Sequence, residues 1–122
     1  MDKCNWMIEG LHMNKGEYGW GIFTKNSVKK GELIERCFMT VLKNVDGNEN
    51  PHLFTWSNDR KTWAAGSGLS PFYNHSETPN IIKKANFTYN ILEIYASRDI
   101  EAGEELRNTY YSKKWRKCFQ NF

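Results

Sequence analysis

The sequence predicts a mainly β fold of short strands with little helix. Brief apolar stretches are separated by turn signals along the chain. Residues 90–97 (NILEIYAS) alternate with apolar side chains on both faces, as a strand covered on both sides does. The 122 residues match the usual size of one domain and contain no internal repeat or low-complexity linker. We therefore expect a single domain over residues 1–122.

In the first half of the chain, turn residues mark where the expected strands begin and end. Residues 20–24 have the aromatic and β-branched character that favours a strand, and they follow a polar turn over residues 15–18. A turn at residues 29–32 leads to a strand, or a pair of strands, over residues 33–42. Asp46-Gly47 indicates another turn, but its neighbours are too polar to indicate a hairpin.

The second half contains shorter signals. Residues 53–56 form a short apolar piece, and residues 58–65 predict a helical turn with a cap at one of its first two residues. Residues that break a helix end this turn: Gly66, Gly68, Ser70 and Pro71. Another turn is indicated over residues 101–104. Residues 113–119 predict a short helix or an ordered tail.

Cysteine spacing and hydropathy exclude several classes of protein. Cys4, Cys37 and Cys118 are odd in number and far apart, and no C-x-x-C pair occurs, so neither a disulfide scaffold nor a zinc site is expected. No apolar stretch approaches the length of a membrane span, and the N-terminus does not resemble a secretion signal. We expect an intracellular protein of the cytoplasm or nucleus, without a metal and without a membrane partner.

The charge is modestly basic, with a formal value of +3 and a pI of about 8.7. Lysines and arginines cluster in two pairs and in the tail at residues 113–117, where solvated surface charge is the simplest interpretation. Nucleic-acid binders usually have a stronger basic excess, so no direct nucleic-acid contact is expected. Five Trp, six Tyr and seven Phe are many for this length, and they must fill a core, line a pocket, or both.

Three motifs carry the functional signal. The first is Gly19-Trp20-Gly21-Ile22-Phe23, whose two glycines allow a ligand to approach the backbone closely, although a glycine-rich turn before a strand gives the same pattern. The second is FYNHSETPN over residues 72–80, where short polar side chains and Pro79 would hold an irregular crossing segment in one conformation. The third is GEELRNTY over residues 103–110. No G-x-G-x-x-G loop is present, so a Rossmann-type methyltransferase is not supported.

In this order, the three motifs resemble the signature of SET-domain lysine methyltransferases, and the resemblance covers residues 16–115. It implies a β-clip fold of short twisted sheets with a C-terminal pseudoknot. It also implies transfer of a methyl group from S-adenosyl-L-methionine to a protein lysine, with S-adenosyl-L-homocysteine as the product and no metal. A histone tail is the family's best-known target, so a lysine-bearing protein or peptide is the expected partner.

The resemblance also assigns roles to residues. Tyr110 would be catalytic, lying where the methyl group meets the lysine nitrogen. The residues implied to bind the cofactor are Gly19, Trp20, Gly21, Asn74, His75, Tyr110 and Trp115. Candidates for the substrate lysine channel are His52, Trp56, Tyr73, Asn108 and Tyr111. For His75, a purely structural role stays equally open, and for Trp115 the alternative is an anchor for the tail.

This chain departs from the family pattern in ways that leave questions open. The family often follows the domain with a zinc-binding cysteine cluster, whereas the tail here has Cys118 alone, which resembles compact free-standing SET proteins of viruses and microbes. A viral protein would act in its host cell. Asn108 stands where the family often has Phe or Tyr, a position that influences how many methyl groups are added. The product state therefore stays undetermined.

Two other functional classes are compatible with the sequence. A catalytically silent SET-like module would bind S-adenosylmethionine or a peptide without turnover. An interaction module would use the fold for pairing, and a homodimer is compatible with the sequence without being indicated by it. Labelled cofactor separates the first class from an enzyme, because a binder transfers no label.

Overall fold

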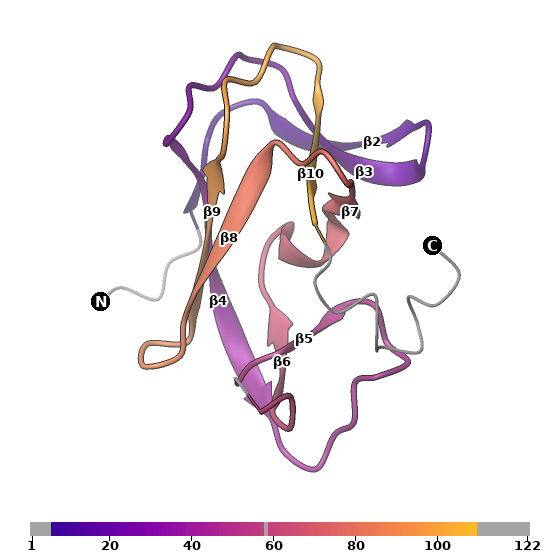
Figure 1. Ribbon diagram of the computed structural model, residues 1–122, viewed down its shortest axis with the longest axis vertical. Coiled ribbons are helices and arrows are strands. Elements are labelled where there is room, and N and C mark those ends of the chain that lie inside the picture. The colour runs from indigo at the N-terminus through magenta and orange to yellow at the C-terminus, as the bar shows by residue number, and fades with distance from the viewer. Residues whose placement is uncertain (1–5, 58, 110–122) are drawn as a thin grey trace.

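Two curled β-sheets make up the computed structural model, which describes residues 6–57 and 59–109 (Figure 1). The larger sheet has six strands in the order β5 (Leu53–Thr55), β6 (Trp63–Gly66), β4 (Leu33–Leu42), β9 (Ile91–Ala96) and β8 (Ile81–Asn86), with β1 (Trp6–Met7) also pairing with β4. The smaller sheet has the order β2 (Leu11–Gly16), β3 (Gly19–Thr24), β10 (Glu105–Asn108) and β7 (Asn74–His75). A single 3-10 turn, η1 (Ser70–Phe72), is the helix of the described residues, so the mainly β prediction is confirmed.

The long strand β4 links the two halves of the larger sheet. Its first part pairs with β9 from Leu33 to Phe38, and its last part pairs with β6 from Met39 to Leu42. Because β4 pairs with β9 along its first part and with β6 along its last part, the β5–β6 pair lies apart from the β8–β9 hairpin in Figure 1. The region between these two pairs is where η1 and β7 lead into the smaller sheet.

The apolar core lies where the two sheets meet. β9 has the pattern expected from the sequence: Ile94 is fully buried, and its neighbours Leu92 and Ala96 are nearly so. Ile22 of β3 and Leu106 of β10 bring the smaller sheet into the same cluster. Burying a side chain of this kind contributes about 1.5–3 kcal/mol, so the apolar cluster holds the two sheets together.

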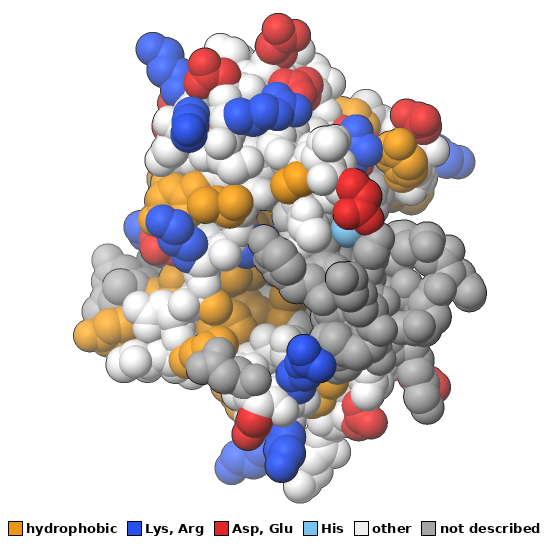
Figure 2. All heavy atoms as spheres, in the orientation of Figure 1, with side chains coloured by type: hydrophobic (Ala, Val, Ile, Leu, Met, Phe, Trp, Pro, Cys, Tyr) orange, Lys and Arg blue, Asp and Glu red, His pale blue; other side chains and the backbone are white. Residues whose placement is uncertain are grey.

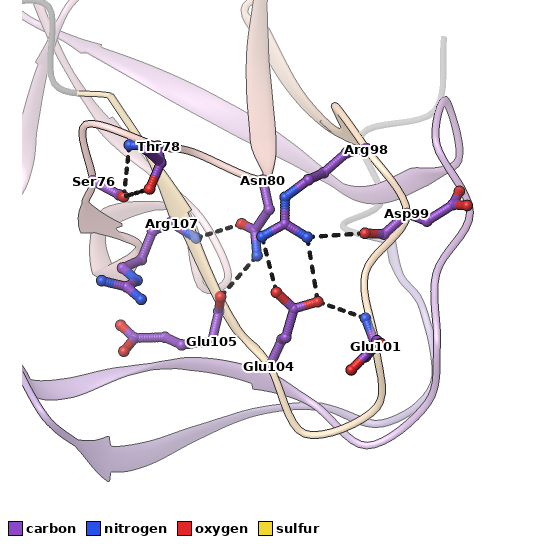
Figure 3. A network of polar contacts seen from close by, with 9 residues as sticks. All are labelled: Ser76, Thr78, Asn80, Arg98, Asp99, Glu101, Glu104, Glu105 and Arg107. Carbon is purple, nitrogen blue, oxygen red and sulfur yellow. Dashed lines mark hydrogen bonds and ion pairs between the residues drawn. The ribbon is translucent and has the colours of Figure 1, made fainter.

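Asn80 fastens β10 to the beginning of β8. Its Nδ2 donates to the carbonyl of Glu105 at 2.9 Å, and its Oδ1 accepts the N–H of Arg107 at 2.8 Å (Figure 3). Its own N–H donates to the Arg107 carbonyl at 3.1 Å. The Asn80 amide thus pairs with the backbone of β10 as a neighbouring strand would. This pairing holds residues 76–80 across β10. The chain beyond Thr109, on which the expected pseudoknot depends, lies outside the described residues.

The helical turn predicted over residues 58–65 is wrong. Trp63 and Ala64 belong to β6, where pairing with both β4 and β5 buries them almost completely. Asp59 does have a capping-like role, but its carboxylate accepts the Lys61 N–H and the Ser57 hydroxyl in a local turn. Arg60 then adopts a positive φ of 63°, which no helix contains. Pairing with distant strands therefore determines the structure of this segment, against its local propensity for a helical turn.

Several other strands were not expected, among them β2 and β8. The polar residues Lys15 and Gly16, predicted as part of a turn, form the end of β2, and the turn is confined to the two residues that follow. Strand β8 also lacks a clear sequence signal because Lys83 and Lys84 interrupt it. No helix within residues 6–57 and 59–109 is long and apolar enough to cross a membrane.

Candidate functional site

Two glycines of β3 shape one corner of the smaller sheet. Gly19 has a φ of +85°, and apart from its two chain neighbours no described residue has a heavy atom within 4 Å of where its Cβ would stand. At Gly21 the reverse holds, because a Cβ would collide with the side chains of Asn74 and Glu105. Gly19 therefore leaves room beside the main chain, and Gly21 leaves room for two polar side chains.

Asn74 and Glu105 meet at this corner, together with the Trp20 backbone. Asn74 Nδ2 donates to the Trp20 carbonyl at 3.1 Å and to Glu105 Oε2 at 2.8 Å. Three strands that are distant in sequence, β3, β7 and β10, thus converge on one amide group. Because both amide hydrogens point at protein acceptors, the amide oxygen is the atom that Asn74 can offer to a ligand.

The side chain of Trp20 takes no part in that convergence. Trp20 is 62% exposed, near the tip of the β2–β3 hairpin, so the carbonyl is the group that it contributes to the corner. Close by, the guanidinium of Arg107 lies over the exposed ring of Tyr18, 4.7 Å from its centroid. This stacking places Arg107 on the outer side of β10, where its charge stays hydrated.

His75 is held through both its backbone and its ring. β7 runs parallel to β10 with His75 opposite Asn108, and the N–H of Ser76 donates to the Asn108 carbonyl at 3.0 Å. The Nε2 of His75 lies 3.0 Å from a carboxylate oxygen of Glu77, whose side chain is largely exposed. These contacts fix the path of the segment that follows Asn74.

Tyr73 is buried between the corner and the larger sheet. It is 1% exposed, and its hydroxyl donates to Glu35 Oε1 at 2.7 Å. The other carboxylate oxygen of Glu35 accepts the Leu69 N–H at 2.8 Å. Burial, helped by the nearby carboxylate, raises the pKa of Tyr73 well above its ordinary value, so the phenol stays protonated. The two hydrogen bonds to Glu35 thus hold in place the segment that leads into Asn74.

Two further channel candidates, His52 and Trp56, lie in different places. The ring of His52 packs edge-on against Phe72, with centroids 5.2 Å apart, so it borders η1. Trp56 instead packs against Phe87, and its Nε1 donates to Asn90 Oδ1 at 2.8 Å. Both contacts of Trp56 are with the turn of the β8–β9 hairpin, at the end of the hairpin that lies away from β7 in Figure 1. The structure therefore brings His52 near Tyr73 but does not bring Trp56 to the same group.

Asn108 is buried with an unusual amide. It is 8% exposed, and its Nδ2 makes a long contact of 3.3 Å to the Thr109 carbonyl. Its Oδ1 is inaccessible to solvent and has no hydrogen-bond partner in the part of the chain that the structure describes. A buried acceptor without a donor costs about 1–3 kcal/mol, so native proteins retain one where a ligand or another function requires it.

We expect Asn108→Leu to stabilise the protein. Leucine has a similar size but buries no amide, so the free energy of unfolding should rise by about 1 kcal/mol in urea denaturation. Asn80→Leu is the matched comparison, because its amide is fully bonded and the same exchange should destabilise. A loss of stability on replacing Asn108 would show that its oxygen has a strong partner in the folded protein.

Three residues of the expected site, Tyr110, Tyr111 and Trp115, lie outside the described residues. Within residues 6–57 and 59–109, no group of three or more His, Cys, Asp and Glu side chains could hold a metal ion. Glu35 and Glu105 were not predicted as site residues from the sequence. Glu105 lies inside the third motif, directly before the buried Leu106. Because neighbouring side chains of a strand point to opposite faces, the sequence could have placed Glu105 on the face of β10 opposite that of Leu106.

Comparison with known proteins identifies the domain. A model of the SET domain matches residues 19–111. The chain is 33% identical over 107 residues to the histone-lysine N-methyltransferase NSD3 of Mus musculus, a match that covers 75% of this chain and 7% of NSD3. The chain therefore spans a small part of that relative.

Solved structures share the fold. One is a Plasmodium falciparum protein provisionally assigned as a histone methyltransferase, with a TM-score of 0.69 and 24% identity, covering 85% of this chain and 95% of that one. Another is the Chaetomium thermophilum polycomb repressive complex 2 in an autoinhibited conformation bound to S-adenosylmethionine. It has a TM-score of 0.68 and 23% identity, and covers 84% of this chain and 15% of that one.

Proposed function

Because the chain belongs to the SET-domain family, we propose that it transfers a methyl group from S-adenosylmethionine to a lysine side chain of another protein. The observation that carries this proposal is the convergence of Gly21, Asn74 and Glu105 at the corner of the smaller sheet. Each belongs to a different one of the three sequence motifs. The motifs that resemble the family signature therefore meet in space at one place.

The chemistry of this corner fits the cofactor. S-adenosylmethionine supplies a methyl group on a positively charged sulfonium, and its methionine end carries an ammonium group. The carboxylate of Glu105 is of the opposite charge, and the amide oxygen of Asn74 can accept a hydrogen bond from an amine. The open backbone at Gly19 leaves space for a ligand against the main chain. The polar contacts of Glu105 keep that carboxylate in place before any ligand binds.

The chain's own residues then need to align a neutral amine and exclude water. The buried Tyr73 and the ring of His52 beside Phe72 make the region next to Asn74 aromatic. Such surroundings remove water from an amine and favour its neutral form, which carries the lone pair that methyl transfer needs. By resemblance, Tyr110 would place its hydroxyl at the reacting nitrogen. Asn108 Oδ1 would accept an N–H of the substrate lysine.

A histone tail is the first substrate to test. The matched relative from Mus musculus is a histone-lysine N-methyltransferase, and the proposed activity on histones would place this chain in the nucleus when it acts. The modified lysine is identified by testing many lysine-bearing sequences together. A peptide array that covers histone and non-histone sequences therefore belongs in the experiment.

We expect the purified chain to transfer labelled methyl groups from S-adenosylmethionine to core histones or to peptides of the array. Tyr110→Phe should lower the rate about 5- to 150-fold, because one transition-state contact is worth about 1–3 kcal/mol. Calorimetry with S-adenosylmethionine separates the part of this loss that lies in cofactor binding, a role that the resemblance also gives to Tyr110. If the native chain binds the cofactor but labels no acceptor at all, the silent binding module replaces the enzyme.

A further inference from the structure

Glu35 is a carboxylate that lies wholly inside the core. It is 0% exposed, and it points to the same face of β4 as the buried Cys37 and Met39. A β-bulge lies directly before it, because the pairing of β4 with β9 shifts register between Leu33 and Glu35. A bulge redirects the side chains of its strand, and here Ile34 and Glu35 are both buried although they follow one another. Burying a carboxylate is costly unless hydrogen bonds satisfy it, so the partners of Glu35 show what it contributes.

Those partners are the two ends of the turn η1. Leu69, which directly precedes η1, donates its N–H to Glu35 Oε2 at 2.8 Å. Tyr73, which directly follows η1, donates its hydroxyl to Glu35 Oε1 at 2.7 Å. One carboxylate therefore fixes both the start and the end of η1 relative to β4.

Further contacts with β4 support the same segment. The Ser67 hydroxyl oxygen accepts the Phe38 N–H at 2.9 Å, and the Ser70 hydroxyl donates to the Ser67 carbonyl at 2.8 Å. Gly66 leaves room for Ser70, because a Cβ at Gly66 would collide with the Ser70 hydroxyl. These contacts hold the beginning of the segment, so the bond from Tyr73 to Glu35 is the one that holds its end.

The surroundings of Glu35 keep its two hydrogen bonds strong. No ion pair to Glu35 is found within residues 6–57 and 59–109, although Lys83 approaches the Tyr73 ring from β8 and its charge attracts that of Glu35. Burial, and then the charge of Glu35, raises the pKa of the Cys37 thiol, which keeps its proton. Figure 2 shows a hollow lined by hydrophobic side chains between the β8–β9 hairpin and the β5–β6 pair. In apolar surroundings water weakens a hydrogen bond little, so both bonds of Glu35 constrain η1.

Tyr73 passes the position of η1 on to the corner of the smaller sheet. Its backbone is extended, with a φ of −72° and a ψ of 124°, so its side chain and that of Asn74 point to opposite sides of the chain. The Tyr73 side chain reaches inward to Glu35, and the Asn74 side chain reaches Glu105. A shift of the chain at Tyr73 would therefore carry the Asn74 amide away from Glu105, together with the amide oxygen that Asn74 offers to a ligand.

We propose that Glu35 is a positioning residue for the cofactor site, which holds the Asn74 amide in its binding geometry through Leu69 and Tyr73. This inference rests on the proposed function. Glu35 acts through Tyr73 rather than on the ligand, and its hydrogen bonds carry the effect. Glutamine can therefore replace it, because the glutamine oxygen can accept the Leu69 N–H while its NH2 group donates to the Tyr73 hydroxyl oxygen.

Calorimetric titration of the full chain with S-adenosylmethionine tests this proposal. Glu35→Leu keeps a similar volume without a polar group, and we expect it to lower cofactor affinity about tenfold. Glu35→Gln should stay within about threefold of the native affinity, because it can keep both contacts. In methyl transfer by Glu35→Leu, KM for the cofactor should rise about as much as the affinity falls, while kcat at saturating cofactor should fall by much less.

Removing the Asn74 amide separates positioning from a general loss of structure. In Asn74→Ala the group that Glu35 positions is absent, so adding Glu35→Leu should lower the affinity by less than about twofold more. Tyr73→Phe removes one hydroxyl and tests the same link if Glu35→Leu does not fold. We expect Tyr73→Phe to bind the cofactor about three- to tenfold more weakly, and this loss should also disappear in Asn74→Ala.

Three results would overturn the positioning role. Tyr73→Phe, or a folded Glu35→Leu, could bind the cofactor as tightly as the native chain does. Either variant could lose the same factor with and without the Asn74 amide, or Glu35→Gln could lose as much as Glu35→Leu. In each case the proposed function stands, because the native chain still binds the cofactor and transfers its label. A native chain that binds no S-adenosylmethionine would overturn both proposals.

Discussion

Gly21→Ala is expected to lower cofactor affinity about 30- to 100-fold while leaving the fold intact. The new Cβ would occupy the space where Asn74 Nδ2 and Glu105 Oε2 meet, so one of the two side chains must swing away. Their hydrogen bond has a charged acceptor, and the swing also moves the Asn74 amide oxygen away from the ligand. Together these two losses should cost about 2–3 kcal/mol of binding free energy. Calorimetric titration with S-adenosylmethionine measures this loss.

Gly31→Ala is the matched control for that variant. Gly31 has a φ of +88° and open space at its Cβ position, and it lies in the turn before β4, outside the site. Alanine there costs about 1 kcal/mol of stability through the left-handed backbone but should not change cofactor affinity. Gly21 has no such φ, so an affinity loss confined to Gly21→Ala must come from the collision.

A double variant shows whether the collision acts through Glu105. In Glu105→Ala the carboxylate is already absent, so adding Gly21→Ala should cost much less than it does in the native chain. Fully additive losses would contradict the idea that the two residues form one unit. Unchanged affinity in Gly21→Ala would remove this corner as the cofactor site.

The sequence predicted the parts of the fold that depend on local pattern. The alternation over residues 90–97 gave β9 to within one residue at each end, because both faces of that strand are covered and its apolar residues are continuous. The turn at Gly31 and the strand after it were also found. Each of these features depends on side chains that lie next to one another in the chain.

Features that depend on distant partners escaped prediction. Trp63 and Ala64 were assigned to a helical turn because nothing in the local sequence reveals that β4 and β5 flank them. Lys83 interrupts the apolar pattern of β8, so this strand was not predicted. Its amine lies against aromatic rings of other elements, which the local sequence does not reveal. In the candidate site, Asn74 was found through its motif, but its pairing with Glu105 is a tertiary contact over 31 residues.

Asn80→Ala is expected to destabilise the protein by about 4 kcal/mol. Its amide bonds the Glu105 carbonyl and the Arg107 N–H, and Asn80 itself is 4% exposed, so alanine would leave a strand donor and acceptor buried without partners. Each such group costs about 1–3 kcal/mol. Urea denaturation followed by tryptophan fluorescence measures the change, and Asn86→Ala, at the exposed end of β8, should cost less than 1 kcal/mol.

Asn80→Asp distinguishes the contribution of the amide donor from that of the amide acceptor. The aspartate keeps an acceptor for the Arg107 N–H, but it sets a carboxylate against the Glu105 carbonyl and beside Glu104, a carboxylate whose pKa is lowered mainly by its hydrogen bond with Arg98 (Figure 3). Burial and these neighbours should raise the folded-state pKa of the new carboxyl above its unfolded value. Protonation at lower pH restores a donor to the Glu105 carbonyl, so the stability deficit relative to the native chain should shrink between pH 7 and pH 5. A deficit that stays constant over this range would mean that the donor half of the Asn80 amide contributes little to holding β10 in place.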